Sequence, residues 1–351
     1  MAPSRMNDLE RRTLGFTPSI GIEPENRIMK RRILLRAAAA GSFAPLVLGH
    51  SAWAAKKGTL RVVVPYAPGG PSDRIARIVS EELQRELGRN VVVENKPGGG
   101  GRVAAQQVKR VRANQDDTLL LGNPAVMVVG PLVFDDVGYD PENDFQAVSE
   151  VGAYDLAIAV GPEVEAQTLP DLLDWLKANP QQANVGVPST GSLVHFFALM
   201  VGDAADTEVE VIGYKGAGPL ITDLIGGQLP VAIDAVDALL PQHEAGKLRM
   251  LATSGEQRSR FLPELPTFKE VGLDVAITGW NAFFAPASMA AETVAEVSEA
   301  IQKVMASEAT QERVISANME PVISDMAQTA HMLRNYRAEL EPVVKRSGYK
   351  P

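Results

Sequence analysis

The segment from Leu60 to Arg77, LRVVVPYAPGGPSDRIAR, constrains the fold more than any other part of the chain. Its first five residues are mostly apolar and typical of a buried strand, a turn rich in Pro and Gly follows, and a helix is predicted to begin at Ser72. The first amides of a helix have no internal acceptor and lie at the positive end of its dipole, and glycine lets a ligand approach the main chain closely. The order of strand, glycine turn and helix therefore predicts an α/β protein with an anion-binding loop.

The rest of the chain repeats this alternation of short apolar strands and amphipathic helices. The predicted strands are Leu60–Val64, Val91–Glu94, Thr118–Leu121, Leu156–Val160, Val185–Val187, Glu208–Ile212, Val231–Asp234 and Arg249–Thr253. The predicted helices include Ser72–Leu87, Leu169–Ala178, Ala217–Ile225 and Glu292–Met305. Because these strands are short and rich in Val, Leu and Ile, they are typical of parallel strands buried on both faces. The sequence thus predicts parallel α/β sheets and a largely helical tail, with one late strand at Pro321–Ser324.

Two longer apolar segments, Val148–Val160 and Val275–Ala287, are predicted to be domain crossings. If the chain leaves one lobe along the first segment and returns along the second, the two form a hinge of two strands. We therefore expect residues 55–154 and 280–351 to form lobe 1 and residues 155–279 to form lobe 2. A cleft between two such lobes is the natural place for a ligand.

The N-terminal segment is predicted to be an export signal. A basic stretch at Met29–Arg32 precedes a short apolar stretch at 37–48, and Ala52-Trp53-Ala54 fits a signal-peptidase site, so the mature chain is expected to start at Ala55. The apolar stretch is too short to span a bilayer. The Arg31-Arg32 pair leaves Sec and twin-arginine export both open. Residues 1–28 have no apolar periodicity, and Met29 is the alternative start of translation.

Composition limits the chemistry and the partners of the chain. There is no cysteine, which excludes disulfides, thiolate nucleophiles and thiolate metal sites, and this suits an oxidising periplasm. The net charge of the whole chain is −9, and because the first 54 residues carry eight Lys or Arg and four Asp or Glu, the remainder has a net charge of −13. Such an acidic protein is a poor partner for nucleic acid or anionic lipid. Any anionic ligand must therefore be held by local donors.

Seven motifs, taken in order, carry a resemblance to a known family. They are VVVPYAPGGPSDRIAR at Val62–Arg77, VVVENKPGGGG at Val91–Gly101, YDPENDF at Tyr139–Phe145, GSLVH at Gly191–His195, YKGAGPLITDLIGGQL at Tyr214–Leu229, GKLRMLATSGEQRSRFLPELPTFKEVGL at Gly246–Leu273 and GWNAFFAPA at Gly279–Ala287. With them the chain resembles the Bug family, the TctC-type extracytoplasmic receptors of tripartite tricarboxylate transporters. The resemblance implies a two-lobed type II periplasmic-binding-protein fold that closes on a small organic carboxylate and delivers it to a membrane permease.

The candidate ligand contacts come from the glycine turn, from a second loop at Pro188–His195, which reads PSTGSLVH, and from positions that the resemblance places near the cleft. They are Tyr66, Pro68, Gly69, Gly70, Ser72, Asp73, Asn123, Ser189, Thr190, Ser192, His195, Tyr214 and Asp234. The segment Asn123–Met127 is less polar than the resemblance would lead one to expect. An apolar wall there favours a bulkier or more apolar ligand than a bare dicarboxylate.

Several of these residues also have a purely structural interpretation. Asp73, at a helix start, is expected to accept main-chain amides rather than touch an anion, and one hydroxyl of the second loop must cap its helix. A lone His195 one turn inside a helix is more often a structural hydrogen-bonding residue than a base. Tyr214 is expected to pack against the cleft. Asp234 would repel a carboxylate unless the ligand offers an ammonium or a hydroxyl, so we expect a water-mediated or hinge role.

The sequence gives little support for a metal site, a nucleotide-binding loop or covalent catalysis. The four histidines, His50, His195, His243 and His331, are dispersed, and NKPGGGG lacks the Gly-Lys-Ser/Thr of a phosphate loop. Ser189 and His195 lack a nucleophile elbow and a third residue, which leaves a small-ester hydrolase as the weakest alternative. We therefore expect a monomeric periplasmic solute-binding protein without cofactor or metal. A sensor input for a two-component system is the main alternative.

Overall fold

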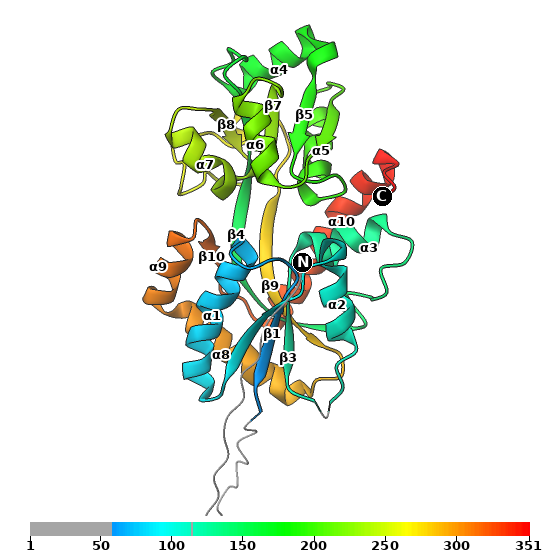
Figure 1. Cartoon of the computed structure of the whole chain (residues 1–351), viewed down its shortest axis with the longest axis vertical. Helices are drawn as coiled ribbons and strands as arrows, with labels where there is room; N and C mark the ends of the chain where they lie inside the picture. Colours follow the sequence, from blue (N-terminus) through cyan, green and yellow to red (C-terminus); the bar gives the residue numbers. More distant parts are fainter. Residues whose placement is uncertain (1–57, 114) are drawn as a thin grey trace, which may run out of the picture. The chain divides into compact units, whose positions relative to one another are not determined.

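Two mixed β-sheets that share one strand organise the part of the chain that the structure describes. The computed structural model describes residues 58–113 and 115–351, which belong to one compact unit. Each sheet is the centre of a lobe, called here the lower and the upper lobe after their places in Figure 1. The predicted export signal, its cleavage site and His50 lie outside the described residues.

The strands follow the sequence pattern closely. They are β1 (Leu60–Val64), β2 (Val91–Asn95), β3 (Thr118–Gly122), β4 (Phe145–Val160), β5 (Asn184–Val187), β6 (Glu210–Gly213), β7 (Val231–Ala235), β8 (Arg249–Thr253), β9 (Thr278–Pro286) and β10 (Glu320–Pro321). All eight predicted strands are therefore present, although Leu156–Val160 is only the end of the much longer β4. The predicted late strand is reduced to the two residues of β10.

The helices agree in the same way. They are α1 (Pro71–Leu87), α2 (Arg102–Lys109), α3 (Gly130–Val133), α4 (Leu169–Ala178), α5 (Leu193–Ala204), α6 (Ala217–Ile225), α7 (Val236–Glu244), α8 (Ala291–Ala306), α9 (Glu308–Ser316) and α10 (Met326–Ser347). In α1 the predicted apolar stripe faces inward, and Ile75, Val79 and Leu83 are fully buried in the core of the lower lobe. Burial of this stripe fixes the direction of the helix and hence the position of the glycine turn before it.

The prediction of parallel sheets is wrong for the central strands. In the lower lobe, β1 pairs in parallel with β2 and β3, but β9 is antiparallel to both β3 and β4. In the upper lobe, β5 pairs in parallel with β6 and β7, while β4 is antiparallel to β7 and β8. The strands that connect the lobes run against their neighbours, and a continuous apolar run does not distinguish the two directions.

The predicted hinge of two strands is confirmed. Residues 145–155 of β4 pair with β9 in the lower sheet, and residues 156–160 pair with β7 in the upper sheet. The buried Ser254 joins the two crossing segments, because its Oγ donates to the carbonyl of Ile277 (2.6 Å) and accepts from the amide of Leu156 (2.8 Å). The side chain thus adds to the main-chain hydrogen bonds that Ser254 makes with Leu156 and Ile277, where the chain passes from lobe to lobe.

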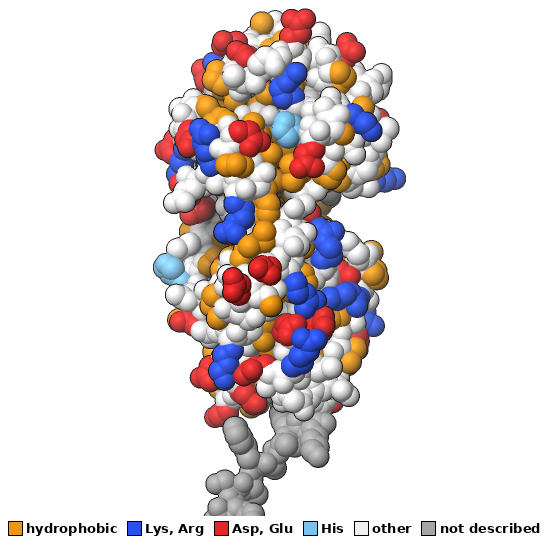
Figure 2. All heavy atoms as spheres, turned by 90° about the vertical axis from the view of Figure 1, so that its left-hand side faces the viewer, with side chains coloured by type: hydrophobic (Ala, Val, Ile, Leu, Met, Phe, Trp, Pro, Cys, Tyr) orange, Lys and Arg blue, Asp and Glu red, His pale blue; other side chains and the backbone are white. Residues whose placement is uncertain are grey.

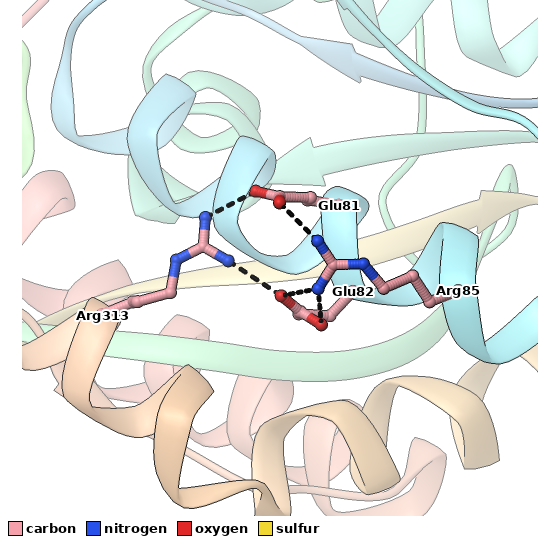
Figure 3. Close-up of polar contacts among 4 residues, drawn as sticks. All are labelled: Glu81, Glu82, Arg85 and Arg313. Carbon is pink, nitrogen blue, oxygen red and sulfur yellow. Dashed lines mark hydrogen bonds and ion pairs between the residues drawn. The ribbon is translucent and has the colours of Figure 1, made fainter.

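The exposed face of α1 is tied to α9 by a network of ion pairs (Figure 3). Arg313 of α9 contacts Glu81 at 2.7 Å and Glu82 at 2.9 Å, and Arg85 of α1 contacts the same two carboxylates at 2.7 Å. All four residues belong to the lower lobe. The network therefore holds two helices of one lobe together and does not bear on the relation between the lobes.

The C-terminal helix α10 contacts both lobes (Figure 1). In its middle, Tyr336 packs edge-on against Trp280 of β9, with ring centroids 5.8 Å apart. Just beyond its end, Tyr349 packs edge-on against His195 of α5 in the upper lobe, at 4.9 Å. Trp280 is 2% exposed and belongs to the hydrophobic core.

Candidate ligand-binding site

The glycine turn after β1 is held in shape by the buried carboxylate of Asp73. This carboxylate accepts hydrogen bonds from the amide of Gly69 (2.8 Å), from Arg77 (2.9 Å) and from Asn95 (2.8 Å). Gly69 has a φ of +90°, a left-handed conformation that glycine adopts without strain. The expectation that Asp73 accepts a main-chain amide therefore agrees with the structure, and the Gly69 amide is already used within the turn.

The free amides of this loop belong to the first turn of α1. The helix begins at Pro71, one residue before the predicted start, and its N-cap, Gly70, makes no side-chain cap. Proline suits this position because its missing N–H would have no partner there. The amides of Ser72 and Asp73 lie in the same turn, where no intrahelical acceptor is available. Pro68 and Gly69 are exposed.

The side chain of Ser72 contacts Asn281, which was not among the predicted ligand contacts. Its hydroxyl donates to Oδ1 of Asn281 on β9 (2.9 Å), and Asn281 is only 1% exposed, yet its Nδ2 has no hydrogen-bond partner. Asn281 is a polar residue in the otherwise apolar run GWNAFFAPA, which is the signal that could have identified it. A buried donor without a partner is costly, so the site gains free energy when an acceptor reaches it.

Tyr66 and Asn123 form a second polar pair in the lower lobe. The tyrosine hydroxyl lies 3.1 Å from Oδ1 and 2.9 Å from Nδ2 of Asn123, and burial raises the pKa of Tyr66 to about 12. Two of the residues that follow Asn123 contribute nothing to the expected apolar wall. Val126 and Met127 are buried in the hydrophobic core, so they give no argument for a bulky ligand.

In the upper lobe, Ser192 is the hydroxyl that caps the second helix. Its Oγ accepts from the amide of His195 (3.3 Å) and donates to the carbonyl of Ser189 (2.7 Å). Ser189 and Thr190 are exposed beside it. The amides of Leu193 and Val194 follow in the first turn of α5, where no intrahelical acceptor exists.

His195 is bound into the structure of this turn. Its Nδ1 accepts the amide hydrogen of Gly191 (2.8 Å), and its ring stacks on Phe196 with centroids 5.0 Å apart. Burial lowers the pKa of His195, which favours the neutral ring that this hydrogen bond requires. These contacts support the structural interpretation of the histidine.

Tyr214 and Asp234 occupy different surroundings. The hydroxyl of Tyr214 donates to Asp223 of α6 (3.0 Å), so its polar end is used within the upper lobe. Asp234, at the end of β7, is 6% exposed; its Oδ1 accepts from the amide of Ala235, and its Oδ2 has no partner. Burial raises the pKa of Asp234 to about 7, so a substantial fraction of the molecules carries it uncharged at neutral pH.

The two lobes meet beside these residues. Arg74 in the first turn of α1 contacts Asp237 in the first turn of α7 at 3.1 Å. Tyr154 of β4 packs on Gly279 of β9, where any Cβ would collide with its ring. Since alternate residues of a strand share a face, Gly279 lies on the same face of β9 as Asn281. Arg74, Tyr154 and Asp237 were not among the ligand contacts predicted from the sequence.

A cavity of about 570 Å³ lies beside the hinge. It is lined by Tyr154 and Thr278 of the hinge, by the upper-lobe segment 255–261 and by Asn318 and Glu320 of the lower lobe. Figure 2 shows apolar side chains on the surface where the two lobes join, with positively and negatively charged side chains around them. None of the predicted ligand contacts is among its described lining residues.

Two further properties concern the described residues only. No group of three or more Asp, Glu or His side chains within 58–113 and 115–351 is arranged to hold a metal ion. Within the same ranges, no helix combines the length and the apolar character that crossing a bilayer requires.

Two α/β lobes joined by two crossing strands, with helix starts and buried polar atoms at the junction, define a binding protein of the type II periplasmic class. The family model described as "Tripartite tricarboxylate transporter family receptor", TctC, matches residues 75–349, and the chain belongs to this family. The resemblance inferred from the motifs is thereby confirmed. The family consists of substrate-binding receptors rather than enzymes.

Individual relatives agree with this assignment. A UPF0065 protein of Bordetella bronchiseptica is 33% identical over 88% of this chain and 92% of its own length. The protein BugT of Bordetella pertussis is 29% identical over 83% of this chain and 90% of its own. The solved structure of R. palustris Rpa4515 with adipate superposes with a TM-score of 0.75 at 27% identity, covering 84% of this chain and 98% of that one.

Proposed function

We propose that this protein is a periplasmic receptor that captures a small organic carboxylate between its lobes. In this proposal it acts as a monomer and delivers its ligand to a membrane permease of the tripartite tricarboxylate type. The export signal predicted at the N-terminus would carry it to the periplasm. The proposed ligand contacts are the main-chain amides at the starts of α1 and α5, together with the polar residues of the candidate site.

One observation carries the proposal: the unpartnered Nδ2 of Asn281 beside the first turn of α1. An amide N–H₂ and free main-chain amides are donors that suit a carboxylate oxygen and need no excess of positive charge. Asp234 adds to this argument, because its raised pKa favours the uncharged form of its carboxyl group. An uncharged carboxyl does not repel an anion, and it can donate a hydrogen bond to it.

The ligand class is supported by the relative that was solved with adipate. Adipate is a straight-chain dicarboxylate, and a chain with two carboxylates can reach donors on both lobes at once. We therefore infer that straight-chain dicarboxylates are the first class to examine. Simultaneous contact with both lobes would make closure depend on the ligand.

Titration calorimetry with a series of dicarboxylates, monocarboxylates and diamines of matched chain length tests the proposal. We expect saturable binding of at least one dicarboxylate and no binding of the diamine of the same length. The Asn281→Leu variant should bind this ligand at least about tenfold more weakly, because a charged acceptor loses its donor, whereas the control Asn335→Leu on the exposed face of α10 should bind normally. Binding of the diamine series alone would overturn the carboxylate proposal.

A further inference from the structure

The ion pair between Arg74 and Asp237 joins the two lobes at the edge of the candidate site. The Nη2 of Arg74 lies 3.1 Å from Oδ2 of Asp237, and the Nη1 of the same guanidinium donates to the carbonyl of Gly69 (3.3 Å). A single side chain of the lower lobe thus contacts both the glycine turn and the start of α7 in the upper lobe. No other residue of α1 has a described hydrogen bond or ion pair with the upper lobe.

The two partners are buried to very different extents. The side chain of Asp237 is 9% exposed, whereas that of Arg74 is 42% exposed. Burial raises the pKa of Asp237, and Arg74 acts in the opposite direction. A carboxylate that loses water in this way is tolerated when a cation compensates it and is costly when the cation is removed. The pair is therefore asymmetric, because a half-exposed Arg74 compensates the charge of a carboxylate that is almost fully buried.

Apart from Arg74, the charged form of Asp237 is favoured by hydrogen bonds from the main-chain amides of Asp237 and Ala238, which lower its pKa. The carboxyl group of Asp234, on the neighbouring β7, raises the local negative charge when it is ionised, and the hydroxyl of Tyr154 from β4 carries no positive charge. The first turn of α7 offers its dipole, which favours an anion by a small amount. Among the described residues, Arg74 is the only cation that contacts Asp237.

We propose that Arg74 and Asp237 form a latch that assembles as the lobes close and holds the closed form. This inference rests on the proposed function, since it assigns a role in the closure that captures the ligand. Separation of the lobes returns Asp237 to water, where it needs no partner, and approach of the lobes buries it against Arg74. Both are positioning residues, which set the balance between open and closed forms without touching the ligand.

Dicarboxylate affinity in four proteins tests the latch: wild type, Arg74→Gln, Asp237→Asn and the double variant. Arg74→Gln leaves a buried carboxylate unpaired and should weaken binding about tenfold or more, whereas Asp237→Asn should cost only about two- to threefold. The double variant should return to the level of Asp237→Asn, because the unpaired charge is gone. If the double variant is as weak as Arg74→Gln, Arg74 acts on the ligand directly and the latch is refuted.

The control is Arg313→Gln, which removes an arginine of similar exposure (40%) from its ion pairs with two glutamates, both more exposed than Asp237, within the lower lobe (Figure 3) and should leave affinity unchanged. A second measurement needs no ligand. The chain has no cysteine, so Asp174→Cys on α4 and Glu296→Cys on α8 allow dye labelling of one site on each lobe. Without ligand, Arg74→Gln should shift the energy-transfer distribution toward open forms, and the addition of Asp237→Asn to that variant should reverse most of the shift.

These two measurements separate the latch from the proposed function. If no carboxylate binds the wild-type protein, the proposed function fails, and the ligand-free distances still decide whether the pair controls closure. If ligands bind but the distance distributions of wild type and Arg74→Gln coincide, the latch is wrong and the receptor function stands.

Discussion

At the scale of single residues, Asp73 determines which amides of the glycine turn are available. Its carboxylate accepts hydrogen bonds from the Gly69 amide and from the side chains of Arg77 and Asn95. The main-chain amides in the first turn of α1 therefore remain available to a ligand. Burial alone would raise the pKa of Asp73, but the hydrogen bonds from Arg77, Gly69 and Asn95 outweigh it and lower the pKa to about 2. The glycine turn is therefore held by the ionised carboxyl group of Asp73, which stays ionised well below the ordinary pKa of an aspartate.

This pKa predicts how acid affects the stability of the protein. The pKa of Asp73 is about 2 in the folded state and ordinarily 3.8, so the unfolded state binds more protons between these values. The stabilisation is fully present above about pH 4 and is lost as the pH falls through about 2. Asp73→Ala should lower the free energy of unfolding at pH 7 by roughly 2 kcal/mol. The difference from wild type should shrink in urea titrations between pH 4 and pH 2.

The control for this prediction is Asp274→Ala, since the Asp274 side chain is 99% exposed. It should unfold like wild type at every pH. A deficit for Asp73→Ala that stays the same from pH 4 to pH 2 would show that the charge of the carboxylate is not the source of its contribution.

At the scale of elements, the hinge depends on the side chain of Ser254, which bonds both to β4 and to the segment before β9. Ser254→Ala removes both hydrogen bonds of the hydroxyl and leaves the buried amide of Leu156 without an acceptor. We expect a loss of about 1–3 kcal/mol in the free energy of unfolding, measured with urea. Ser316→Ala deletes an exposed hydroxyl that bonds only within α9 and should cost little. Equal stability of the two variants would contradict the role of Ser254.

The same scale shows what the sequence could predict. The positions of strands such as β1 and β8 and of helices such as α4 and α6 follow from local apolar patterns, and the two loops at helix starts follow from turn and cap chemistry. The antiparallel direction of β9 and the contacts of Arg74 and Asn281 do not. Ser72 and Asn281 are 209 positions apart, and Arg74 and Asp237 are 163 apart, so no local pattern links them.

At the scale of the whole molecule, the C-terminal segment connects the lower lobe to the start of α5. Tyr349 packs on both His195 and Phe196. Its removal in Tyr349→Ala should loosen the turn at residues 189–195, and amide hydrogen exchange there should accelerate by up to about tenfold. Tyr349→Phe keeps the ring and should exchange like wild type. Unchanged exchange in the alanine variant would show that the turn is held without the C-terminus.

The placement of β9 also has a consequence for the order of folding. The upper sheet is built from one continuous stretch, β4 to β8, which ends at Thr253. The lower sheet needs β9 between β3 and β4, and this strand begins only at Thr278. Because synthesis proceeds from the N-terminus, all strands of the upper sheet can pair before β9 has been made. Until then, β3 and the first half of β4 lack the strand that lies between them. The lower lobe, which contains the N-terminal end of the described chain, is therefore the one that is completed last.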